Sequence, residues 1–282
     1  MVEDFIVSTA SLPYTLLIVL IQLSVGSVWM LNIFSSKYEL TNGYLLTASL
    51  SIISALLISI VIILLNPIPS SIDGFQTDLA YETFISISLV ALTGVLTALS
   101  LFIRRQTNSL RTPVATVASI VGLLTILLLG AIFSGPAWSA TLLYLNLIFG
   151  SLVLGGAFMA MLWGHWYLTS GSLPKEPMVS MSLFTLMCLI LHSIIVIISS
   201  LLPGSSPPEN EISLAVLHME LTFWLRVGVG LIFPIAATWL AFHAARIGGM
   251  MSTTGLLYLA LGALLGGETL GRALFFITAV VL

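Results

Sequence analysis

The sequence predicts an all-α, polytopic integral membrane protein with eight transmembrane helices, and two observations support this prediction. Of the 282 residues, 59% are hydrophobic and 7% are charged, with a mean hydropathy of +1.16, whereas soluble domains average about 45–50% apolar and ~25% charged residues. A hydrocarbon core of about 30 Å needs roughly 20 apolar residues per helix. Eight stretches meet this requirement: 11–34, 44–66, 80–103, 113–133, 138–168, 178–201, 215–245 and 254–281.

Each stretch is separated from the next by a short segment that contains Pro, Gly, Ser or charged residues. In chain order the segments are 35–43, 67–79, 104–112, 134–137, 169–177, 202–214 and 246–253. None of them is long enough to fold alone. We therefore expect a single transmembrane domain that covers residues 1–282.

The distribution of lysine and arginine predicts the orientation of the helices. The side reached after helices 1, 3, 5 and 7 holds Lys37, Arg104, Arg105, Arg111, Lys175 and Arg246, and the opposite side holds none. Because cytoplasmic loops carry an excess of basic residues, we expect both termini outside, in a multi-pass protein of the cell inner (cytoplasmic) membrane. The outward side is acidic, with Glu3, Asp4, Asp73, Asp78, Glu209 and Glu211.

The chain has a single cysteine, Cys188. One cysteine excludes a disulfide, an iron–sulfur cluster held by thiolates and covalent c-type haem within this chain. No phosphate-binding loop or dinucleotide fingerprint is present. We expect membrane lipid around the chain, and no nucleic acid as a partner.

Polar residues inside the stretches gather in the outer half of the predicted bundle. They come from five helices and are Gln22, Glu82, His192, His218, Glu220, Arg226, Glu268 and Arg272. Charged side chains at bilayer depth are costly, about 2.5–3.5 kcal/mol or more each, and mark functional sites. A quinone, with polar carbonyls and an apolar body, would suit such a site, because its redox chemistry needs hydrogen-bond donors and proton carriers.

Several of these residues have a purely structural alternative. Glu268 and Arg272, four residues apart, could form an intrahelical pair. His218 could be an interfacial residue at a helix start, and Gln22 could bond to a neighbouring helix. Pro234 is expected to kink the seventh helix or loosen its hydrogen bonds. The glycines of the last helix are expected to allow close helix packing: Gly262, Gly266, Gly267 and Gly271.

Haem b is a further possibility, because bis-histidine ligation needs two histidines at similar depth. His165 and His243 match in depth near the inner face, where an interfacial role is the alternative. His192 and His218 form a second, less well matched pair.

Two motifs resemble those of a known family, the eight-helix membrane-anchor subunits of the dimethyl sulfoxide reductase and polysulfide/nitrite reductase type. The family pattern Gly-Glu-x-x-Gly-Arg-x-x-Phe in the last helix is matched by Gly267, Glu268, Gly271, Arg272 and Phe275. The first-helix pattern, Gln followed four residues later by Gly, is matched by Gln22 and Gly26, and Glu82 occupies a position similar to a family glutamate. The family's histidine after the second helix is missing from 65–69, and His192 or His218 could supply the missing proton carrier.

This resemblance implies a membrane-anchor subunit of a respiratory oxidoreductase complex, as in anaerobic respiration. Such a subunit binds menaquinone or ubiquinone near the outer face and exchanges electrons with an iron–sulfur partner, often beside a molybdopterin subunit, or with a haem partner. Glu268, His192 and Glu82 would then carry protons, and Arg272 and Gln22 would be donors to a quinone carbonyl or partners of the carboxylates. Two alternatives stay open: a small-solute or proton transporter or channel, and a structural subunit of a respiratory or photosynthetic complex.

Overall fold

The computed structural model describes residues 10–135, 137, 139–170, 173–201 and 221–282. Within them it contains eight helical spans that are long and apolar enough to cross a membrane, which confirms the predicted all-α, eight-helix fold. The helices are α1 (Leu12–Lys37), α2 (Asn42–Leu65), α3 (Glu82–Arg104), α4 (Asn108–Phe133), α5 (Ala140–Ser170), α6 (Glu176–Leu201), α8 (Leu221–Val227), α9 (Phe233–Arg246) and α10 (Met250–Thr278).

The seventh span consists of α8, a π-helical turn η2 (Gly228–Ile232) and α9. The π-turn ends two residues before Pro234, which lacks a backbone N–H and so interrupts the regular hydrogen-bond ladder. The expected loosening of this helix at Pro234 is therefore confirmed. The predicted start of the helix, residues 215–220, lies outside the described residues.

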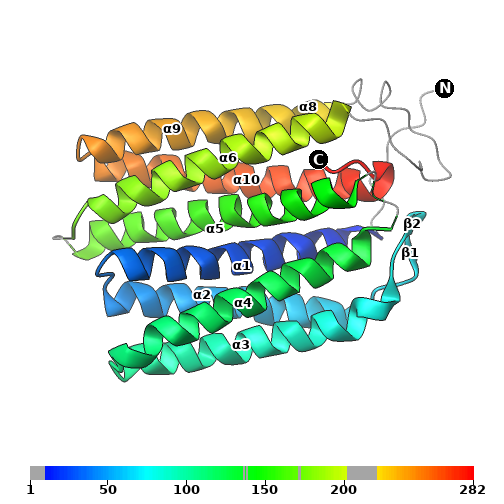
Figure 1. Ribbon diagram of the computed structural model, residues 1–282. Helices are drawn as coiled ribbons and strands as arrows, with labels where there is room; N and C mark the ends of the chain where they lie inside the picture. The colour runs from blue at the N-terminus through cyan, green and yellow to red at the C-terminus, as the bar shows by residue number, and fades with distance from the viewer. Residues whose placement is uncertain (1–9, 136, 138, 171–172, 202–220) are drawn as a thin grey trace.

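The spans run alternately up and down the bundle (Figure 1). We call the end where α1 begins and α10 ends the terminal end. We call the opposite end the basic end, because it carries Lys37, Arg104, Arg105, Arg111, Lys175 and Arg246. Which end faces which side of a membrane stays a prediction.

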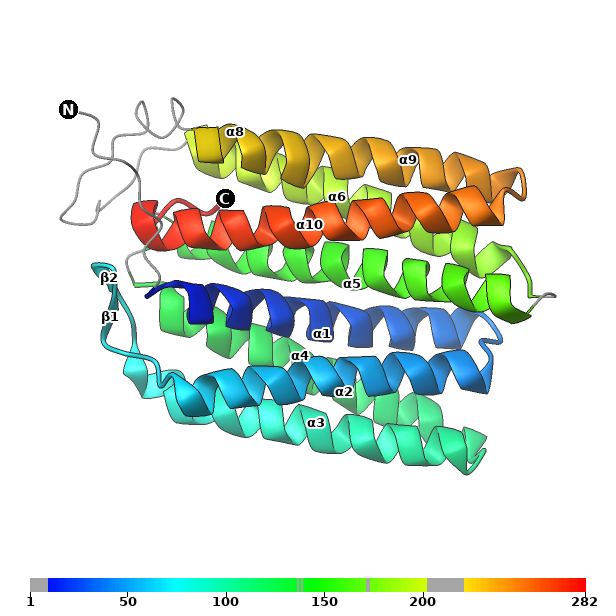
Figure 2. The same ribbon diagram turned by 180° about the vertical axis from the view of Figure 1, so that it is seen from behind.

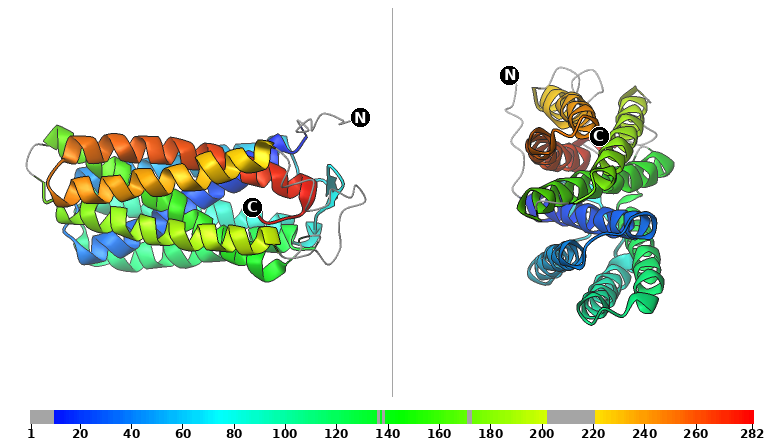
Figure 3. Two further views of the ribbon diagram at one scale, coloured as in Figure 1. Left: turned by 90° about the horizontal axis from the view of Figure 1, so that it is seen from above. Right: turned by 90° about the vertical axis from the view of Figure 1, so that its left-hand side faces the viewer.

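The helices form two groups of four spans, which meet along α1 and α5 (Figure 2; Figure 3, right). One group is α1–α4, and the other is α5, α6, α8–α9 and α10. Gly26 of α1 lies so close to the backbone of Ser151 in α5 that a side chain there would clash, and Gly155 of α5 in turn faces Gly26. The glycine of the Gln22–Gly26 motif therefore lets these two central helices approach closely.

A short hairpin that the sequence did not predict lies between α2 and α3 at the terminal end. Strands β1 (Ser71–Ile72) and β2 (Phe75–Gln76) pair antiparallel, and a 3₁₀ turn, η1 (Leu79–Tyr81), leads into α3. The two residues that connect β1 to β2, Asp73 and Gly74, have positive φ angles. Phe75 is fully buried, with its ring centroid 4.9 Å from that of Phe275 of α10. Phe75 thus anchors the hairpin to α10 at the terminal end of the bundle.

Candidate functional site

The centre of the candidate site is the carboxylate of Glu268 in α10. Its Oε1 atom accepts a hydrogen bond from Arg226 Nη2 at 2.6 Å and lies 2.9 Å from His192 Nε2. Its Oε2 atom accepts from Arg272 Nη2, one helical turn further along α10, at 3.0 Å. Glu268 therefore joins three helical spans, so the expected intrahelical pair exists but is one part of a larger network.

Arg272 extends the network to α1. Its Nε donates to Gln22 Oε1 at 3.2 Å, and Gln22 Nε2 donates to the carbonyl oxygen of Leu147 in α5 at 3.1 Å. Gln22 thus bonds to a neighbouring helix, as the structural alternative predicted, and also to a predicted site residue. We refer to Gln22, His192, Arg226, Glu268 and Arg272 as the polar core cluster.

All five side chains of the polar core cluster are buried, with at most 1% of each residue exposed. They come from α1, α6, α8 and α10, and their positions along these helices place them in the half of the bundle nearer the terminal end. The structure therefore brings together five of the eight polar residues that the sequence places in one half of the bundle.

Glycines make room for the cluster on two sides. On α5, a side chain at Gly150 would clash with Gln22 Nε2. On the other side, Gly267 of α10 packs directly on Gly230 of the π-turn, and a Cβ at Gly271 would lie 2.9 Å from Arg226 Nε. The close-packing role is confirmed for Gly267 and Gly271.

The other two glycines of α10 do not take part in such packing. A Cβ added at Gly262 or at Gly266 would meet no atom within 4 Å. For these two positions the predicted close packing is wrong, because both face open space on the surface of the bundle.

The cluster has more donors than acceptors. Arg226 Nε and Nη1, Arg272 Nη1 and His192 Nδ1 are buried and have no hydrogen-bond partner among the described residues. Two guanidinium groups face one carboxylate, so the cluster carries one excess positive charge even with a neutral histidine. Buried donors without partners are costly. The arrangement is therefore suited to a ligand that supplies acceptor oxygens.

His192 can hold its proton in two ways. Its Nε2 atom lies 3.0 Å from Arg226 Nη2 and 2.9 Å from Glu268 Oε1. A neutral imidazole either donates from Nε2 to Glu268, or accepts there from Arg226 and carries the proton on Nδ1. In the second form the Nδ1–H group is the donor without a partner. The contacts of His192 are thus compatible with both neutral tautomers.

Asn146 of α5 is a polar residue that sequence reasoning missed. It is fully buried, and neither its Nδ2 nor its Oδ1 atom has a partner among the described residues. It precedes Gly150 by one helical turn and is next to Leu147, whose carbonyl binds Gln22. The sequence signal that could have identified Asn146 was the presence of an amide side chain inside the fifth apolar stretch.

Of the remaining predicted residues, Glu82 lies elsewhere and Glu220 lies outside the described residues. Glu82 is half-buried at the start of α3, where its Oε1 accepts from the backbone N–H of Ile68 at 3.2 Å. It therefore anchors the connection between α2 and α3, outside the polar core cluster. His218 lies outside the described residues.

The histidines considered as haem ligands at the inner face are both exposed. His165 Nδ1 lies 3.4 Å from Tyr258 Oη, and His243 Nδ1 lies 3.0 Å from the carbonyl oxygen of Trp239 on its own helix. His192 directs Nε2 at Glu268 and Arg226. In the part of the chain that the structure describes, no three His, Cys, Asp or Glu side chains form a group that could hold a metal ion.

Comparison with known proteins gives no relative: no family model, curated protein or solved structure matches this chain.

Proposed function

We propose that this chain is the membrane subunit of a respiratory oxidoreductase complex and that it binds quinone or quinol at the polar core cluster. The observation that carries the proposal is the buried contact of Glu268 with His192 and Arg226, surrounded by N–H groups without a partner in the described part of the chain. A quinone carbonyl is an acceptor without a charge of its own, and its hydrocarbon body suits the apolar helices around the cluster.

In this proposal each member of the cluster has a role. Arg272 and Gln22 orient one another across α10 and α1, and the Nη1 atom of Arg272, which has no partner among the residues described, binds a quinone oxygen. Arg226 provides two further donors from α8. Because Glu268 is held between two arginines, its charge is stabilised, and we assign the proton transfer to His192.

Oxidation of a quinol releases two electrons and two protons. The electrons would pass to a partner subunit that holds iron–sulfur clusters or haem, because the single cysteine of this chain cannot ligate a cluster. The protons would leave through His192 towards the terminal end. The reverse steps would reduce a quinone.

The experiment that tests the proposal is a gentle native purification, followed by identification of the co-purifying chains, metals and quinones. We expect quinone together with a partner that carries iron–sulfur clusters, molybdopterin or haem. A protein that purifies alone, without quinone or metal, would contradict the proposal.

That contradicting result would favour a transporter or channel. Transporter sites are typically built from two interrupted helices in matching halves. Among the described spans, the seventh is interrupted by the π-turn Gly228–Ile232. Arg226 lies next to this turn. The polar core cluster would then line a solute or proton path.

A further inference from the structure

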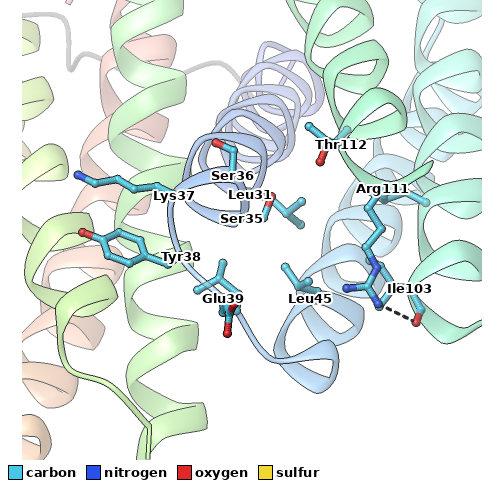
Figure 4. A pocket seen from close by; sticks show the side chains of 13 residues that line it. Leu31, Ser35, Ser36, Lys37, Tyr38, Glu39, Leu45, Ile103, Arg111 and Thr112 are labelled. Carbon is cyan, nitrogen blue, oxygen red and sulfur yellow. Dashed lines mark hydrogen bonds between the residues drawn. The ribbon is translucent and has the colours of Figure 1, made fainter. Parts of the chain in front are cut away.

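A separate cavity lies at the basic end of the bundle, within the first group of four helices. It has a volume of about 560 Å³, is partly open, and is formed by the ends of α1 to α4 (Figure 4). Its polar lining residues are Ser35, Ser36, Lys37, Tyr38, Glu39, Arg111 and Thr112, and its apolar ones are Leu31, Leu40, Leu45, Leu99, Ile103 and Ala115. None of them belongs to the polar core cluster.

Arg111 is the basic side chain that faces this cavity. It is half-buried near the start of α4, and its Nη2 atom donates to the carbonyl oxygen of Ile103 at 3.4 Å. Its Nε atom is buried and has no partner among the described residues. Figure 4 shows Arg111 on the α3–α4 side of the cavity, whereas Lys37 and Tyr38 point away. Tyr38 instead bonds to Ser180 of α6, at 2.6 Å.

The surroundings favour a ligand with an anionic head and an apolar body. The basic end carries six lysines and arginines against two acidic residues, Glu39 and Glu176. The start of α4 adds the positive end of a helix dipole. Beneath this polar mouth, the leucines Leu31, Leu45 and Leu99 are buried and apolar. A small hydrophilic anion would leave these apolar walls without a partner.

We propose that this cavity binds the phosphate head group of an anionic phospholipid, with Arg111 donating hydrogen bonds to the phosphate oxygens. An arginine presents several donors in a planar fork that matches phosphate geometry. Basic pockets between transmembrane helices bind such head groups. Glu39, which is exposed at the rim, lowers the affinity for the anion.

The test is native mass spectrometry of the purified protein in detergent, titrated with phosphatidylglycerol or with phosphatidylcholine of the same acyl chains. We expect phosphatidylglycerol to bind more tightly, and Arg111→Gln to weaken its binding by about fivefold. Arg105→Gln is the matched control, because Arg105 is exposed at the same end and does not line the cavity. It should change the affinity little.

A second variant tests the same site by a gain of binding. Glu39→Gln removes the negative charge at the rim and should strengthen phosphatidylglycerol binding. The proposal is overturned if the two lipids bind equally, or if Arg111→Gln and Arg105→Gln have the same effect. Its lipid assignment is overturned if inorganic phosphate at millimolar concentration displaces phosphatidylglycerol from the wild-type protein.

Discussion

The carboxylate of Glu268 lies 2.6 Å from the guanidinium of Arg226, and these two residues are 42 positions apart in the chain. Both are fully buried. This ion pair fixes α10 against α8, and it holds His192 of α6 within 3.0 Å of both partners. The contacts that form the candidate site therefore also hold α6, α8 and α10 together.

Glu268→Gln should destabilise the protein strongly, because it leaves Arg226 and Arg272 buried without a counter-charge. Breaking a buried ion pair in this way costs about 3–5 kcal/mol. Arg226→Gln should cost less, since Glu268 keeps Arg272 as its partner. Thermal unfolding in detergent gives the melting temperatures of both variants. Equal melting temperatures for the two would show that the charge balance of the cluster does not determine its stability.

Gly267→Ala should separate α10 from the π-turn. A Cβ at this position would collide with the Cα atom of Gly230, and overpacking of this kind costs about 1–3 kcal/mol. Gly262→Ala and Gly266→Ala are matched controls on the same helix, because each new methyl group meets no atom within 4 Å. Thermal unfolding of the three variants should rank Gly267→Ala clearly below the other two.

The variant Asn146→Leu tests whether the amide of Asn146 contacts a ligand or contributes only to the stability of the fold. The amide has no partner among the described residues, so its removal should leave the stability unchanged or raise it. If the amide binds the quinone, the same variant should weaken quinone binding by about tenfold, the value of one hydrogen bond of 1.4 kcal/mol. A titration with quinone and a melting curve test the two parts. Unchanged affinity would exclude Asn146 from the site.

The fold was readable from the sequence because each span is a long apolar stretch and each gap is polar. The depth of each residue in the membrane could also be estimated from the helical rise. This estimate predicted that one half of the bundle holds Gln22, His192, Arg226, Glu268 and Arg272. The contacts of Glu268 with Arg226 and His192 were not predictable, because they depend on the rotation of each helix about its own axis.

Two features escaped sequence reasoning for physical reasons. The hairpin Ser71–Gln76 is too short to show a strand pattern, and its burial depends on the aromatic rings of α4 and α10. Glu82 starts its helix as expected. Its carboxylate bonds to the backbone N–H of Ile68 in the connection between α2 and α3, a local contact that composition cannot reveal.

The most direct test of the proposed function is quinol-dependent electron transfer by the natively purified complex, compared between wild type, His192→Ala and Glu82→Gln. If His192 transfers the proton, its loss should lower turnover by about 100-fold or more. Glu82→Gln, which alters a carboxylate outside the polar core cluster, should retain activity close to that of the wild type. Unchanged turnover in His192→Ala would contradict the assignment of quinol chemistry to this cluster.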